Sequence, residues 1–227
     1  MGEIDLKDLK LLYEEELKDK VKANCTPFCV RISENFDGKD GVLFVGKAEN
    51  MKDKDNVTID DAFAKAFRKI EKGWMNSLYK KPTGNAANSA YNRVIYRLAK
   101  FLKDEKGINS FARTNLYKLS STKSYLFSSK FESAYLDIFK KELEILQPKF
   151  VIMLTGGLEE NFLSHLGKNQ KIKSVPFSYK NKGNMQNKKI YYIKIEGFDS
   201  IFIRAFHPQG KPEKELIESI KMLVQDN

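Results

Sequence analysis

Two hydrophobic patterns alternate along the chain. Short apolar runs that end at glycine or turn residues predict buried strands, and apolar residues that recur every three or four positions predict amphipathic helices. The predicted strands span residues 41–46, 110–116, 150–154, 191–195 and 201–206. The predicted helices span residues 5–22, 88–102, 131–146, 159–166 and 212–223, and a further helix begins near residue 60. In the helix over 88–102, the spacing assigns Tyr91 to the apolar face together with Val94 and Leu98.

The alternation of apolar strands with amphipathic helices is typical of an α/β fold. We predict a three-layer α/β/α sandwich in which helices cover both faces of a central, mostly parallel sheet of about four strands. The 227 residues suffice for one sizeable core, and no repeat or linker divides them. We therefore predict a single domain over residues 1–227, with an N-terminal helical extension over about residues 1–40.

Composition narrows the class of protein. The apolar runs are too short to cross a bilayer, and the charged N-terminus is unlike a secretory signal, so we expect a cytoplasmic protein without a membrane partner. Cys25 and Cys29 lack the paired histidines that a zinc site needs. We therefore predict no metal and no cofactor, and we expect a monomer.

The charge of +10 is concentrated in two regions. Residues 167–195 contain eight lysines and no acid, and residues 109–131 likewise contain basic residues but no acid, with aromatic residues interleaved in both. This mixture suits a nucleic-acid groove, where lysines meet phosphates and rings meet unstacked bases; a solvated lysine-rich surface is the alternative interpretation. The candidate contacts to DNA phosphates are Lys118, Lys123, Lys180 and Lys182.

The ends of the predicted strands carry the candidate chemistry, because parallel α/β sheets bind ligands outside the carboxyl ends of their strands. These ends are residues 46–50, 115–118, 155–157 and 206–210. The amide of Asn115 offers a donor and an acceptor that can read the edge of a pyrimidine, and His207 can donate a hydrogen bond to an oxygen that gains negative charge. Alternatively, Asn115 is a turn residue and His207 orders the turn before Pro208. Their joint occurrence at strand ends favours a functional site.

The order of these segments resembles the uracil-DNA glycosylase superfamily over about residues 41–224. Residues 42–50 are similar to its first strand and water-activating loop, residues 111–118 to its second strand, residues 146–154 to its third strand, and residues 204–208 to its last strand with a His-Pro motif. The resemblance implies that DNA, single- or double-stranded, is the partner and that a nucleotide flips into the crevice. It implies a base-binding set made of Gly46, Lys47, Ala48, Asn115 and Pro208. It also implies a catalytic set made of His207, Glu49 and Asn50, with the base stacked on an aromatic ring such as Trp74, Tyr117, Tyr125 or Phe177.

The first motif departs from the family pattern. Lys47 and Ala48 stand where the family carries a carboxylate or amide that positions water, and Glu49 stands at the usual proline. Two cysteines also exclude the branch that holds an iron–sulfur cluster with four. Three hypotheses follow: a DNA glycosylase that excises uracil or another damaged base, a non-catalytic member that binds nucleic acid or a base, and an unrelated α/β protein that binds a small ligand.

Overall fold

The computed structural model describes residues 4–18, 26–33, 35–47, 58–64, 89–103, 110–120, 132–181 and 183–225. The described helices are α1 (Lys7–Leu17), the short 3-10 helix η2 (Gly38–Asp40), α2 (Ile59–Ala64), α4 (Ala90–Lys103), α5 (Glu132–Leu146), α6 (Glu160–Leu166) and α7 (Glu213–Gln225). The described strands are β1 (Thr26–Pro27), β2 (Arg31–Ile32), β3 (Val42–Gly46), β4 (Phe111–Asn115), β5 (Leu119–Ser120), β6 (Phe150–Leu154), β7 (Asn169–Asn181), β8 (Asn184–Ile195) and β9 (Ile201–Ala205).

The main sheet is mixed and has seven strands in the order β2-β4-β3-β6-β9-β8-β7. The four strands β4, β3, β6 and β9 are parallel to one another. β2 pairs antiparallel with β4 at one edge, while β8 and β7 add an antiparallel pair at the other. The predicted α/β class is therefore confirmed, whereas the prediction of a sheet of about four mostly parallel strands is wrong.

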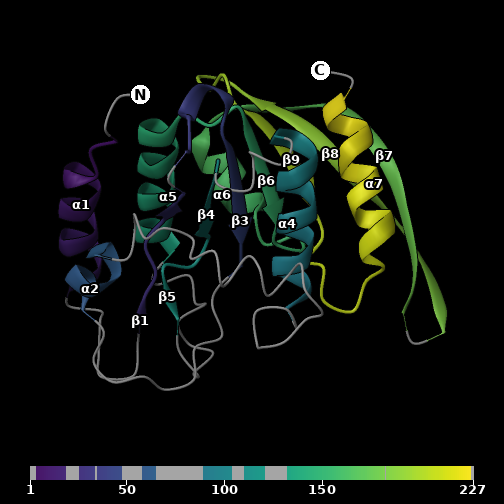
Figure 1. Ribbon diagram of the computed structural model, residues 1–227, viewed down its shortest axis with the longest axis horizontal. Coiled ribbons are helices and arrows are strands. Elements are labelled where there is room, and N and C mark those ends of the chain that lie inside the picture. The colour runs from purple at the N-terminus through teal and green to yellow at the C-terminus, as the bar shows by residue number, and fades with distance from the viewer. Residues whose placement is uncertain are drawn as a thin grey trace.

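Helices cover both faces of the parallel strands (Figure 1). One hydrophobic cluster joins α1, α5 and α6 to one face of the sheet, and a second cluster joins α4 and α7 to the other face. Side chains of β6 alternate between them, since Val151 and Met153 belong to the first cluster and Ile152 and Leu154 to the second. Because both faces are buried, the strand is apolar throughout.

The N-terminal residues form more than the helical extension that we predicted. α1 buries Leu9, Tyr13 and Leu17 in the first cluster. The segment that follows supplies β1, which pairs with β5, and β2, which extends the main sheet. The described residues before β3 therefore contribute to the hydrophobic core and to both sheets.

The largest addition to the predicted fold is the hairpin of β7 and β8, of which we predicted only residues 191–195. Pairing between β8 and β9 covers Tyr191 to Lys194 of β8, and the remainder of β8 pairs with β7 alone. Residues 175–181 and 183–190, which we call the arm, project beyond the rest of the sheet at the lower right of Figure 1. In the part of the chain that the structure describes, no helix is both long and apolar enough to cross a membrane.

Candidate functional site

The four predicted strand ends lie at the same end of the sheet, where the carboxyl ends of β3, β4, β6 and β9 meet. Gly46 at the end of β3 pairs with Asn115 at the end of β4, and Leu154 at the end of β6 pairs with Ala205 of β9. The connections also contact each other, because the backbone N–H of Leu116 donates to the carbonyl of Gly46 over 2.9 Å. The convergence follows from the parallel direction of these neighbouring strands.

Gly46 lets two side chains approach the backbone closely. A Cβ atom at this position would lie 2.6 Å from Oδ1 of Asn115 and 2.9 Å from the hydroxyl oxygen of Tyr91. Real Cβ atoms do not tolerate such contacts, so only glycine fits here without a shift. The Asn115 amide and the Tyr91 ring therefore both lie against the end of β3, and the Asn115 side chain is nearly buried.

His207 faces the same Tyr91 ring. The two rings are almost parallel, at an angle of 11°, and their centroids are 6.1 Å apart. In the turn after β6, a Cβ atom at Gly156 would lie 3.5 Å from the His207 Cβ. Tyr91 thus stacks on His207, and its hydroxyl lies beside Oδ1 of Asn115 at the same point above Gly46.

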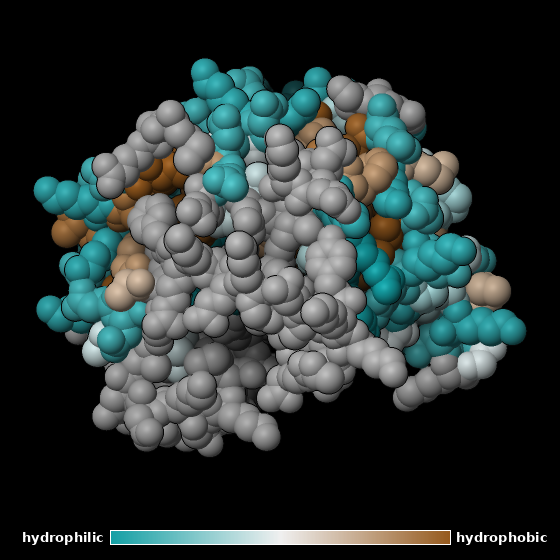
Figure 2. All heavy atoms as spheres, in the orientation of Figure 1, coloured by the Kyte–Doolittle hydropathy of each residue, from teal (hydrophilic) through white to brown (hydrophobic). Residues whose placement is uncertain are grey.

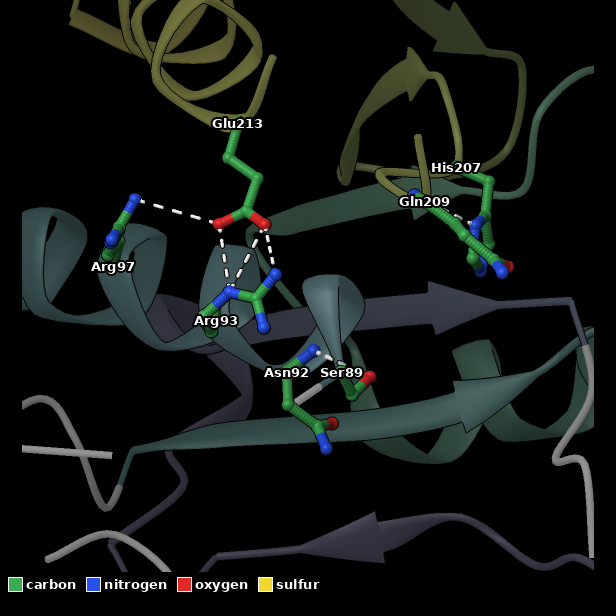
Figure 3. Close-up of polar contacts among 7 residues, drawn as sticks. All are labelled: Ser89, Asn92, Arg93, Arg97, His207, Gln209 and Glu213. Atoms are coloured by element: carbon green, nitrogen blue, oxygen red, sulfur yellow. Dashed lines mark hydrogen bonds and ion pairs between the residues drawn. The ribbon is translucent and has the colours of Figure 1, made fainter. Parts of the chain in front are cut away.

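The surroundings of His207 favour one neutral form of its imidazole. The backbone N–H of Gln209 donates to Nδ1 over 3.3 Å (Figure 3), so the neutral ring carries its proton on Nε2. Burial lowers the pKa of His207, and the positive charges of Lys211 and Lys47 lower it further. The side chain is therefore a neutral hydrogen-bond donor at neutral pH.

An ion pair joins α4, which carries Tyr91, to α7, which follows His207 in the chain. Arg93 follows Tyr91 by two residues in α4. It binds the carboxylate of Glu213 through Nε and a terminal guanidinium nitrogen (Figure 3). Glu213 begins α7, which follows the loop that carries His207. At the start of α4, the hydroxyl oxygen of Ser89 accepts a hydrogen bond of 3.4 Å from the backbone N–H of Asn92 and so caps the helix.

A buried carboxylate shapes the turn after β6. Glu159 accepts hydrogen bonds from the Thr155 hydroxyl, from the backbone N–H of Gly157 at 2.9 Å and from Nε of Arg204 at 2.5 Å. Gly156 and Gly157 both have positive φ angles, which favour glycine. This network fixes the turn that packs beside His207.

Our prediction that Lys118 contacts DNA phosphates is wrong. Its side chain is 0% exposed, and Nζ lies 2.6 Å from a carboxylate oxygen of Glu142, which is equally buried. Nζ also donates to the hydroxyl of Thr114 over 2.7 Å, and Glu142 accepts further hydrogen bonds from Thr114 and Tyr13. Burial lowers the pKa of Lys118 and raises that of Glu142, and their mutual attraction opposes both shifts. Lys118 and Glu142 therefore form a buried ion pair that also binds Thr114, the residue before Asn115.

The remaining predicted residues fall into two groups. Lys47 and Lys180 are exposed, and Pro208 is buried next to His207. Outside the described residues lie Ala48, Glu49, Asn50, Lys123 and Lys182, and the stacking candidates Trp74 and Tyr125.

The aromatic ring at the site is one that we had assigned to a helix core. Tyr117 packs edge-to-face on Tyr135 and Phe162, and Phe177 stacks on Phe206. Tyr91 lies in the first turn of α4, where a side chain can extend past the edge of the sheet. Its position at a helix start was the only signal in the sequence.

The described residues offer no group of three or more His, Cys, Asp or Glu side chains that could hold a metal ion. No protein-family model matches the chain, and a search of curated proteins finds no relative. The function is therefore argued from the residues at the strand ends.

Proposed function

We propose that the protein is a DNA glycosylase-like enzyme that binds a flipped-out base, uracil or another damaged base, at the carboxyl ends of β3, β4 and β9. The observation that carries the proposal is that Tyr91 lies next to both polar groups at the carboxyl ends of the strands. Its hydroxyl and Oδ1 of Asn115 approach the same point above Gly46, and its ring stacks on a neutral, Nε2-protonated His207. A pyrimidine needs both groups, because its edge presents donors and acceptors and its carbonyl oxygen gains charge on departure.

The proposed reaction is hydrolysis of the N-glycosidic bond. As this bond breaks, its electron pair moves to the base, and Nε2–H of His207 donates a hydrogen bond to the base oxygen that becomes negative. The positive charges of Lys47 and Lys211, which already lower the pKa of His207, also favour the anionic leaving group. Water then adds to C1′ of the sugar, and its proton passes through solvent to the base anion, which leaves as the neutral base. Glu49 and Asn50 are the residues that we propose to position this water.

A base-release assay tests the proposal. Oligonucleotides that contain uracil, single-stranded and double-stranded, are incubated with the protein and with His207→Ala and Asn115→Ala variants. We expect release by the unmodified protein and a loss of about 10²- to 10³-fold in each variant, since each removes a hydrogen bond to developing charge or to the base. His165→Ala, a change at the exposed histidine of α6, is the matched control and is expected to leave release unchanged.

Two results would overturn the assignment. Release that survives both substitutions would place the chemistry elsewhere. Neither binding nor release would favour a small ligand at the same sheet edge.

A non-catalytic role is the second candidate function. It is favoured by Lys47, whose exposed ammonium follows Gly46 directly at the position where the family carries a water-positioning group. Such a protein would bind DNA that contains the damaged base, lose this binding when Asn115 is replaced, and release no base. Binding measured beside release separates the two functions.

A further inference from the structure

The arm extends from the sheet on the side of the candidate site. Its pairs run from Val175↔Ile190 to Asn181↔Asn184, and β9 pairs with neither strand over this length. At about 3.4 Å per residue, seven residues in each strand reach roughly 20 Å past the last pair with β9. Figure 1 shows the free end of the arm on the same side of the molecule as the carboxyl end of β3.

The arm has one packed face and one open face. Val175, Phe177 and Ile190 belong to the hydrophobic cluster that includes α7. The opposite face consists of the cross-strand pairs Pro176↔Lys189, Ser178↔Asn187 and Lys180↔Met185, all exposed. Hydrophilic residues predominate among the coloured residues at the lower right of Figure 2, where Figure 1 places the arm.

Aromatic contacts tie the arm to the loop that carries His207. Phe177 stacks on Phe206, with ring centroids 5.6 Å apart and an interplanar angle of 21°. Tyr179 packs against Phe177 at 5.4 Å, and the ammonium of Lys211 lies 5.5 Å from the Tyr179 ring centroid. The arm is therefore held at a set position relative to His207.

The chemistry of the arm matches a nucleic-acid duplex. Lys180, Lys188 and Lys189 are exposed, and residues 167–195 contain no acid that would neutralise them. Lys180 and Lys189 lie on the open face, whereas Lys188 pairs with Phe177 on the other face. Four amide side chains lie near the free end: Asn187 on the open face, and Asn181, Asn184 and Gln186 on the other. Ammonium groups bind phosphates without regard to sequence, whereas amides bind base edges. A two-stranded ribbon fits the major groove of B-form DNA, which is about 12 Å wide, but not the deep, narrow major groove of an RNA duplex.

We propose that the arm enters the major groove of double-stranded DNA and makes duplex DNA the substrate class of the site at the strand ends. This inference rests on the proposed function, because it places DNA at that site. The arm holds the duplex beside His207, and the lysines on its two strands contact the phosphates that flank the groove.

A charge-reversal experiment tests the arm. The arm variant is Lys180→Glu/Lys188→Glu/Lys189→Glu. The control is Lys7→Glu/Lys39→Glu/Lys140→Glu, which makes the same change in net charge at exposed positions on α1, η2 and α5. Fluorescence anisotropy measures binding to an undamaged DNA duplex, to one of its strands and to an RNA duplex of the same sequence, each over a range of salt concentrations.

We expect the arm variant to lose at least about tenfold in affinity for duplex DNA. The slope of its log affinity against log salt concentration should become shallower by the amount that corresponds to two to three lost phosphate contacts. Its affinity for the single strand is expected to change by no more than about twofold, as in the control. Equal losses in the two variants would show a net-charge effect and overturn the inference. So would equal losses on single and double strands, or RNA duplex binding as strong as that of DNA.

Base release from a single-stranded uracil oligonucleotide separates this inference from the proposed function. Selective loss of duplex binding without any base release in the unmodified protein would support the arm and contradict the enzyme. Base release with no selective loss in the arm variant would support the enzyme and contradict the arm.

Discussion

The parallel strands and the arm belong to one sheet but meet different surroundings. In β3 and β6 every residue is buried, because helices cover both faces. In the arm one face packs toward α7 while the other meets solvent, so buried residues such as Val175 and Phe177 alternate with exposed ones such as Pro176 and Ser178. The covered strands position the candidate site at their ends, and the arm offers an open, basic surface beside it.

The comparison shows that burial in the tertiary structure decides whether a lysine forms an internal ion pair or faces solvent. We predicted phosphate contacts for both Lys118 and Lys180. Lys118 follows a covered strand and is paired with Glu142 in the interior, whereas Lys180 lies on the open face of the arm. Only the second can meet a phosphate.

The largest expected effect comes from breaking the buried pair. Glu142→Ala leaves the ammonium of Lys118 buried without its carboxylate, which costs about 3–5 kcal/mol in the free energy of unfolding. The substitution Lys180→Ala on the arm is expected to change it very little. Urea denaturation monitored by circular dichroism measures both.

Glu144→Ala, an exposed position on the same helix, is the control for Glu142→Ala. Similar unfolding midpoints for the two α5 variants would contradict the difference between covered and open positions. Replacing both partners, as in Lys118→Met/Glu142→Leu, is expected to recover much of the loss, because no buried charge is left alone.

A smaller effect is expected from crowding the end of β3. Gly46→Ala places a methyl group against Asn115 and Tyr91, and such overpacking costs about 1–3 kcal/mol. In an Asn115→Ala background the same substitution is expected to cost less, since one of the two close contacts is gone. A double-mutant cycle on the free energy of unfolding measures this coupling; strictly additive values would show that the two residues do not share the space.

The contact between α4 and α7 joins the two regions, because α7 packs near both β9 and the arm. Arg93→Ala removes the two-point ion pair with Glu213 and is expected to lower the free energy of unfolding by about 1 kcal/mol. Arg97 lies 3.7 Å from the same carboxylate and is more exposed, so Arg97→Ala should have a smaller effect. Thermal melts compare the two variants, and equal shifts in Tm would argue against the role of Arg93.

The smallest effects concern the titration of His207. Its pKa is lowered from the ordinary value of 6.5, so its contribution to stability is present above pH 6.5 and is lost as the pH falls through the lowered pKa. NMR of the imidazole Cε1–H, assigned with His207→Gln, follows this titration. Lys211→Ala and Lys47→Ala should each raise the pKa, because each removes a nearby positive charge. Lys180→Ala on the arm should leave it unchanged, and a pKa at or above the ordinary value in the unmodified protein would contradict the assigned environment.

The covered part of the fold could be predicted well. The strands predicted at 41–46 and 110–116 are observed as Val42–Gly46 and Phe111–Asn115, and the helix predicted at 131–146 is observed as Glu132–Leu146. These elements are buried, so their sequence carries a strong apolar pattern. β7 was missed because lysine, serine and asparagine dominate its exposed positions, although Val175, Phe177 and Tyr179 alternate as an amphipathic strand requires.

The sequence by itself determined the α/β class, the strand ends and the presence of Asn115 and His207 at two of them, because apolar periodicity and chain order are local properties. Only the tertiary structure decided that Tyr91 stacks on His207 and approaches Gly46 from the same side as Asn115, that Glu142 lies opposite Lys118, and that the lysine-rich segment forms an arm beside the site. These features depend on contacts between residues far apart in the chain. Local pattern does not encode such contacts; the packing of the helices on the sheet creates them.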